Sequence, residues 1–156
     1  TQIARYYVVM EYLEGVNLDA VLEGTTTTKT GDIVPLAQGF LSKYKADRIG
    51  ATIDIMHDIL VGVAELHNNE YVHRVIDPSN AMLTSMGHVK VIDFGLADGD
   101  DYAIFKSSAG TLRYASPEQL NPDWKIDSRT DIYSFGKILE FVFPGKYQSI
   151  VKLCLK

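Results

Sequence analysis

Side chains that carry oxygen ligands gather in one short stretch of this sequence, "YVHRVIDPSNAML", which spans residues 71–83. Asp77 and Asn80 lie within it, and Asp93 follows thirteen residues beyond Asn80, directly after an apolar run. Carboxylate and amide oxygens are the ligands that Mg²⁺ prefers, and one of each leaves room for phosphate and water. Taken alone, an asparagine or an aspartate is more often a turn former. The motifs around this stretch therefore decide how it is interpreted.

Four motifs follow one another along the chain, and each of them is weak by itself. They are "HRVIDPSN" (73–80), "DFG" (93–95), "GTLRYASPE" (110–118) and "DIYSFG" (131–136). With the motifs in this order and at these distances, the sequence resembles a serine/threonine-type protein kinase. Its overall sequence character is similar to that of the eukaryotic-like kinases of bacteria. The resemblance covers nearly the whole chain. It departs from the catalytic-loop pattern H-R-D-x-x-x-x-N at the third position, where Val75 replaces the catalytic aspartate.

The resemblance implies an α+β, protein-kinase-like fold, with a mostly helical C-lobe and a few short β-strands. We expect residues 1–156 to form a partial kinase domain, in which 1–15 hold the last N-lobe strand and the hinge, and 16–156 the C-lobe. The Gly-rich loop, the strand lysine and the helix glutamate of the family are absent from the sequence. The N-lobe is therefore expected to be largely missing, and the chain to be cut out of a longer one.

Hydrophobic periodicity predicts the elements that position these motifs. A strand is expected over 6–10, a short helix carrying Leu18, Val21 and Leu22, and a Thr- and Gly-rich loop over 23–35. The spacing of three and four residues predicts a long amphipathic helix with the apolar positions Ile49, Ile53, Met56, Leu60, Val63 and His67. Two strands at 81–83 and 89–92, a helix over 132–143 ended by Pro144-Gly145, and a further helix from Ile150 complete the prediction.

The family implies a nucleotide site for ATP at the top of the lobe. Met10 stands at the gatekeeper position, and Glu11 to Leu13 resemble the hinge, whose backbone bonds adenine. Met82 would form the floor of the adenine pocket. Core packing is an equally compatible interpretation of Met10 and Met82. Asn80 and Asp93 would bind Mg²⁺.

Other positions of the array have structural or regulatory roles in the family. His73 would stack with Phe94, and Asp131 would bond back to the backbone of the catalytic loop or act as a helix N-cap. Arg74 would pair with a phosphoserine of the activation segment, for which Ser107 and Ser108 are candidates beside the alternative of ordinary loop serines. Glu118 would pair with an arginine in a later helix. The activation-segment residues singled out are Phe94, Gly95, Ser107, Ser108, Thr111 and Glu118. His57, His67 and His88 show no metal-ligand pattern and are expected at the surface or at strand ends.

Two departures in the catalytic loop predict impaired phosphate transfer. Valine at position 75 can neither orient a substrate hydroxyl nor accept its proton, and losing such a group costs about 10²–10⁴ in rate. Asp77 stands where serine/threonine kinases usually hold a lysine, so it would repel a phosphate. Asp77 as a displaced base remains a weak alternative. The sequence thus predicts a serine/threonine kinase-like domain with impaired transfer to protein, or alternatively a pseudokinase scaffold or a non-functional gene remnant.

Composition excludes some partners and compartments. The formal net charge of −5 argues against nucleic acid or an anionic membrane as the main partner. No apolar run approaches the roughly 20 residues that span a bilayer. The single cysteine, Cys154, cannot form an internal disulfide, so a reducing compartment and a cytoplasmic location are expected. The expected partners are ATP and a protein, either as substrate or as binding partner.

Overall fold

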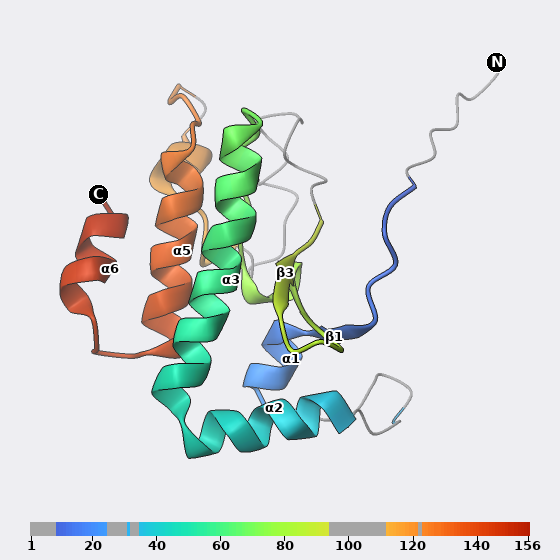
Figure 1. The fold of residues 1–156 in the computed structure, drawn as a ribbon. Coiled ribbons are helices and arrows are strands. Elements are labelled where there is room, and N and C mark those ends of the chain that lie inside the picture. Colours follow the sequence, from blue (N-terminus) through green and yellow to red (C-terminus); the bar gives the residue numbers. More distant parts are fainter. Residues whose placement is uncertain (1–8, 25–30, 32–34, 94–111, 122) are drawn as a thin grey trace.

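The longest helix of the chain, α3 (Arg48–Asn68), forms the centre of a helical body (Figure 1). It packs against α5 (Arg129–Val142) and against α2 (Pro35–Ala46), and α6 (Gln148–Cys154) packs on the outer side of α5. This computed structural model describes residues 9–24, 31, 35–93, 112–121 and 123–156. The predicted mostly helical body with a few short strands is confirmed.

Burial of one face explains the stability of α3. Asp47 caps its N-terminus, where the carboxylate accepts a hydrogen bond from Gly50 N at 2.9 Å. The side chains that α3 contributes to the core recur at spacings of three and four: Ala51, Thr52, Ile55, Met56, Ile59 and Val63. The prediction of one long amphipathic helix here is therefore confirmed.

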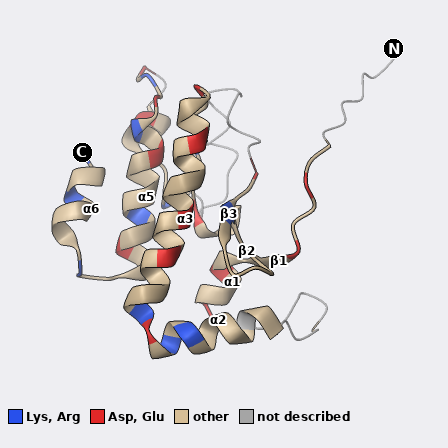
Figure 2. Cartoon of the chain, viewed as in Figure 1, with Lys and Arg blue, Asp and Glu red and all other residues tan. Residues whose placement is uncertain are grey.

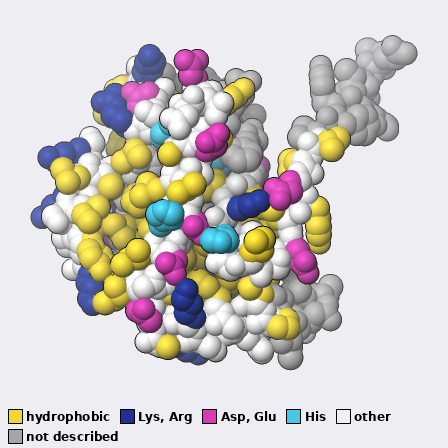
Figure 3. All heavy atoms as spheres, viewed as in Figure 1, with side chains coloured by type: hydrophobic (Ala, Val, Ile, Leu, Met, Phe, Trp, Pro, Cys, Tyr) yellow, Lys and Arg dark blue, Asp and Glu magenta, His cyan; other side chains and the backbone are white. Residues whose placement is uncertain are grey.

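The predicted apolar face of α3 is partly wrong. Ile49, Ile53 and Leu60 are 48%, 58% and 39% exposed. Figure 3 shows hydrophobic side chains gathered on the face of the helical body that it presents. Because α3 carries apolar residues on more than one face, the positions of α5 and β3 decide which of them is covered. In the view of Figure 2, α2 shows basic side chains and the middle of α3 shows acidic ones.

A three-stranded antiparallel sheet of order β1-β2-β3 lies beside α3. Its strands are β1 (Gly15–Asn17), β2 (Ala81–Thr84) and β3 (Val89–Val91). The hairpin of β2 and β3 was predicted, and its turn includes Gly87 with φ 83°. β1 was missed, because three residues without alternation give no strand signal. A Cβ at Gly15 would collide with the carbonyl of Leu83, so a glycine is needed for this close pairing.

The N-terminal part of the chain differs from the prediction. Of the strand expected over 6–10, residues 6–8 lie outside the described residues, and Val9 and Met10 are not in a strand. Val9 is 96% and Met10 is 76% exposed, so core packing of Met10 is wrong. The predicted short helix is α1 (Leu18–Leu22), which follows β1 directly and buries Leu18 and Val21.

A corner formed by Arg48 and the aromatic rings of Tyr44 and Phe143 joins α2, α3 and the end of α5. Arg48 Nη2 donates to the carbonyl oxygen of Val142 at 2.6 Å, at the end of α5. Its guanidinium carbon lies 5.5 Å from the ring centroid of Tyr44 and 5.6 Å from that of Phe143. α2 was not predicted, since its polar residues interrupt the apolar pattern; it is held in place by this corner and by packing of Phe40 and Leu41.

Candidate active site

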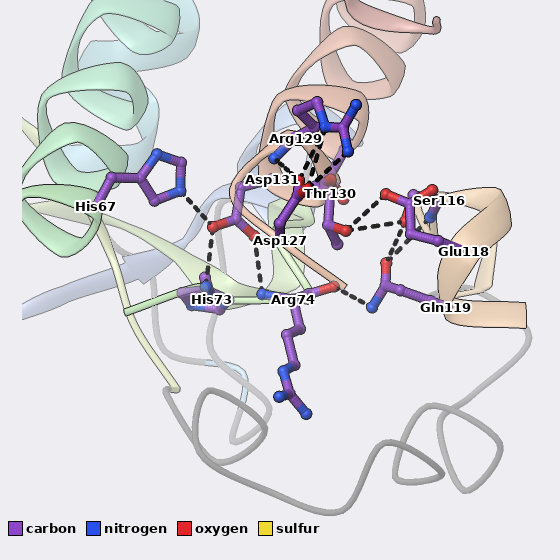
Figure 4. A network of polar contacts seen from close by, with 11 residues as sticks. His67, His73, Arg74, Ser116, Glu118, Gln119, Asp127, Arg129, Thr130 and Asp131 are labelled. Atoms are coloured by element: carbon purple, nitrogen blue, oxygen red, sulfur yellow. Dashed lines mark hydrogen bonds and ion pairs between the residues drawn. The ribbon is translucent and has the colours of Figure 1, made fainter. Parts of the chain in front are cut away.

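The start of the catalytic loop, residues 73–80, is fastened to α5 by one buried carboxylate. Asp131 is fully buried, and it accepts hydrogen bonds from the backbone N of His73 at 2.9 Å and of Arg74 at 2.8 Å (Figure 4). These are the contacts that we expected for Asp131. His67 Nε2 lies 2.8 Å from Asp131 Oδ2. The side chain of His67 is only 21% exposed, so its assignment to the surface was wrong, whereas the side chains of His57 and His88 are 71% and 68% exposed.

A second buried side chain holds the loop from another element. Gln119 belongs to η3 (Pro117–Leu120), a short 3₁₀ helix, and is 3% exposed. Its Nε2 donates to the carbonyl oxygen of Arg74, and its Oε1 accepts from Ser116 N at 3.0 Å. Figure 4 shows Gln119 and Asp131 reaching the loop from different elements, while the Arg74 side chain points away from both. The sequence analysis missed Gln119, although Ser116 and Gln119 have the S-x-x-Q spacing of a capping box, which the structure forms.

Val75 lies in an apolar cluster. It is 5% exposed and packs with Ala115 and with the partly buried Leu112. Both neighbours belong to the segment that carries the G-T-x-x-Y-x-S-P-E motif. Position 75 therefore packs against two apolar side chains of this segment, an environment that favours an apolar residue over a carboxylate.

Asp77 acts as the N-cap of η1 (Pro78–Asn80), a single 3₁₀ turn. Its Oδ1 accepts from Ser79 N at 2.7 Å, from Asn80 N at 3.1 Å and from the hydroxyl of Ser79. Its Oδ2 is buried without a hydrogen-bond partner among the described residues, and the side chain is 2% exposed. Burial raises the pKa of the Tyr114 phenol, and the nearby charge of Asp77 adds to this effect. The carboxylate thus organises the loop from within and does not face solvent.

Asn80 and Asp93 lie at the ends of neighbouring strands. The register pairs Ala81 with Val91, and Ile92 N donates to the carbonyl oxygen of Asn80 at 2.8 Å. The amide nitrogen of Asn80 donates to the Val75 carbonyl at 3.0 Å, which leaves its amide oxygen as the candidate metal ligand. Among the residues described, no cluster of three or more His, Cys, Asp or Glu could hold a metal ion. One amide and one carboxylate oxygen still fit Mg²⁺, which usually takes few protein ligands and completes its shell with phosphate and water.

Three other nucleotide-site candidates lie on or beside the sheet. Met82 is partly buried on β2, between Ala81 and Leu83, which are fully buried. Glu11 pairs with Lys90 of β3 at 3.0 Å, and Leu13 is partly buried. One exposed ion pair thus connects residue 11, expected in the hinge, with the edge strand β3. His73 is buried, and its Nε2 lies 3.1 Å from the carbonyl oxygen of Ile92.

Most of the expected activation-segment residues cannot be placed. Phe94, Gly95, Ser107, Ser108 and Thr111 lie outside the described residues. Glu118 is partly buried and accepts a hydrogen bond from the Thr130 hydroxyl at 2.6 Å.

A surface ion pair lies beside Glu118. Asp127 pairs with Arg129 at 2.7 Å, and hydrogen bonds from Arg129 hold the pKa of Asp127 at about 2.

None of the described helices is long and apolar enough to cross a membrane.

Known proteins and one known protein family are similar to this chain over most of its length. The family model of the protein kinase domain matches residues 1–148. The chain is 31% identical over 147 residues to the serine/threonine-protein kinase PknB of Mycobacterium tuberculosis, covering 90% of this chain and 20% of that protein. It is also 31% identical over 158 residues to the serine/threonine-protein kinase PrkC of Bacillus subtilis, covering 97% of this chain and 21% of that protein. The chain therefore spans about a fifth of the length of these curated relatives.

Proposed function

Because this chain belongs to the protein kinase domain family, we propose that it is the C-lobe part of a serine/threonine kinase-like domain that binds Mg²⁺-nucleotide and transfers phosphate slowly or not at all. The boundaries proposed are those of the sequence analysis, with the hinge region in 1–15 and the C-lobe in 16–156. The observation that carries the proposal is the burial of Val75 against Leu112 and Ala115 at the catalytic position.

Nucleotide binding is supported by what the loop retains. Asn80 and Asp93 offer the two protein oxygens that a magnesium ion needs beside phosphate. When bound, Mg²⁺ would neutralise charge on the nucleotide phosphates. The residues of this chain orient those ligands: Asp131 fixes the start of the loop, and the hydrogen bond from Asn80 to the Val75 carbonyl fixes the amide.

Within the catalytic loop, the side chain at position 75 cannot accept the substrate proton. A general base must come within about 2.6–3.2 Å of that proton's oxygen. Asp77 is the remaining carboxylate of the loop, and three donors from Ser79 and Asn80 already occupy its Oδ1. Its burial argues further against a reach to a protein hydroxyl. The second candidate function, transfer with Asp77 as displaced base, is favoured only by the family's reaction.

Two measurements on the longest natural chain test the proposal. Mg²⁺-ATP should raise the melting temperature more than metal-free ATP does, and Asp93→Asn should remove this difference. In the phosphotransfer assay, Asp77→Asn is the matched variant, because asparagine still caps η1 but cannot act as a base. An unchanged residual rate is expected. Loss of that rate would establish Asp77 as the base, and the absence of a metal-dependent shift would refute nucleotide binding.

A further inference from the structure

The peptide groups on both sides of Arg74 are each held by a buried side chain (Figure 4). The N–H of Arg74, in the peptide that follows His73, donates to Asp131 Oδ1 at 2.8 Å. The C=O of Arg74, in the peptide that leads to Val75, accepts from Gln119 Nε2 at 2.5 Å. The two bonds therefore fix both backbone rotations at Arg74, and with them the direction in which residue 75 points.

The backbone of Arg74 needs such support. Its φ is 72°, in the left-handed region that a residue with a Cβ adopts only at a cost. A conformation of this kind persists where the surroundings over-determine it. Asp131 bonds the peptide before Arg74 and does not reach the carbonyl of the peptide after it. Gln119 supplies the second restraint.

The site around Gln119 requires an amide. Its Oε1 accepts from Ser116 N at 3.0 Å and from Ser116 Oγ at 3.2 Å, while its Nε2 donates to a carbonyl. A backbone N–H can only donate and a carbonyl can only accept, so the side chain between them must offer an acceptor and a donor on neighbouring atoms. At 3% exposure, water cannot replace either partner.

We infer that Gln119 is a positioning residue of the catalytic loop, acting through the carbonyl of Arg74. Through Ser116, which precedes η3, it makes the orientation of position 75 depend on the placement of the S-P-E segment. The same dependence applies to Val75 and to any residue substituted for it. The inference is independent of whether phosphate transfer occurs.

The substitution Gln119→Glu keeps the shape of the side chain and, when the new carboxyl is ionised, removes its hydrogen-bond donor. When ionised, the new carboxylate presents only acceptors to the Arg74 carbonyl; when protonated, it can donate again. Hydrogen exchange at the amides of Arg74 and Val75, compared with the unchanged chain at the same pH, should show about a tenfold or greater loss of protection at pH 7. Burial raises the pKa of a carboxyl group above the usual glutamate value of about 4.3, so the new side chain is neutral at pH 4 and protection there should return to within about threefold.

The control is Gln38→Glu, the same change at an exposed position of α2. The charged neighbours Arg74, Glu118 and Asp131 are present in all chains, and comparison with the unchanged chain at the same pH removes the titration that they show without the new carboxylate. A loss that is equal at both pH values, or one that the control reproduces, would overturn the inference. If Gln119→Glu does not fold at pH 7, Ser116→Ala provides the test, because it removes one of the two hydrogen bonds to Gln119 Oε1. About threefold lower protection at the amides of Arg74 and Val75 would support the inference. Unchanged protection would overturn it.

Discussion

Replacing Val75 by aspartate restores a carboxylate to the third position of the catalytic loop. In this structure the new carboxylate would lie against Leu112 and Ala115, at a position that is 5% exposed. Burial favours the neutral acid, so the folded-state pKa should rise above the unfolded value of about 3.9. A rise of about two to three units corresponds to about 3–4 kcal/mol, because each unit is worth about 1.4 kcal/mol.

The sign of this effect fixes its pH dependence. Because the folded pKa is raised, the ionisation penalty is absent below about pH 4, grows as the pH rises toward the folded pKa, and stays constant above it. Val75→Asn is the matched control, since it has the same shape and no charge; it should cost about 1–3 kcal/mol at every pH.

Urea unfolding followed by circular dichroism, at pH 4.5 and at pH 7.5, provides the measurement for both variants. Equal stability of Val75→Asp and Val75→Asn at pH 7.5 would show that position 75 is open to solvent. The reasoning on the apolar cluster would then fail. If it holds, restoring the aspartate alone should not restore phosphate transfer.

Three further predictions concern the framework. Arg48→Met should lower the free energy of unfolding by about 1–2 kcal/mol, because it removes the hydrogen bond to the end of α5 and two cation–π contacts; urea unfolding measures this, and no change would discount the corner. Arg129→Ala should move the NMR titration midpoint of Asp127 from about 2 toward about 3.9, with little change in melting temperature because the pair is exposed; an unmoved midpoint contradicts the assignment. Since the Asp127 pKa is depressed, this pair stabilises above the unfolded pKa of about 3.9 and its contribution is lost as the pH falls toward 2. Gly15→Ala should destabilise by about 2 kcal/mol and expose the β2 amides that face β1 to hydrogen exchange; retained protection would show that the strands can shift apart.

The family and part of the order of elements, without β1 and α2, could be predicted from the sequence because they depend on local patterns. The spacing of three and four predicted α3 and α5, and the turn at Gly87 predicted the β2–β3 hairpin. These signals lie within windows of a few residues, and each element buries its own apolar stripe. The faces of α3 could not be ranked in this way, since Ile53 and Ile55 are chemically alike and differ only in what packs against them.

The chemistry of the catalytic loop could likewise be predicted from the sequence only in part. That Val75 can neither accept a proton nor orient a hydroxyl follows from its side chain alone, so the prediction of impaired phosphate transfer came from the sequence by itself. Whether Asp77 could replace the missing base depended on where its carboxylate points, and the turn through Ser79 and Asn80 directs it inward as a cap. Gln119 meets the Arg74 carbonyl across 45 residues of chain. A hydrogen bond depends on distance and angle, which only tertiary packing sets between segments so far apart, and for this reason the second restraint on the loop was decided by the folded structure.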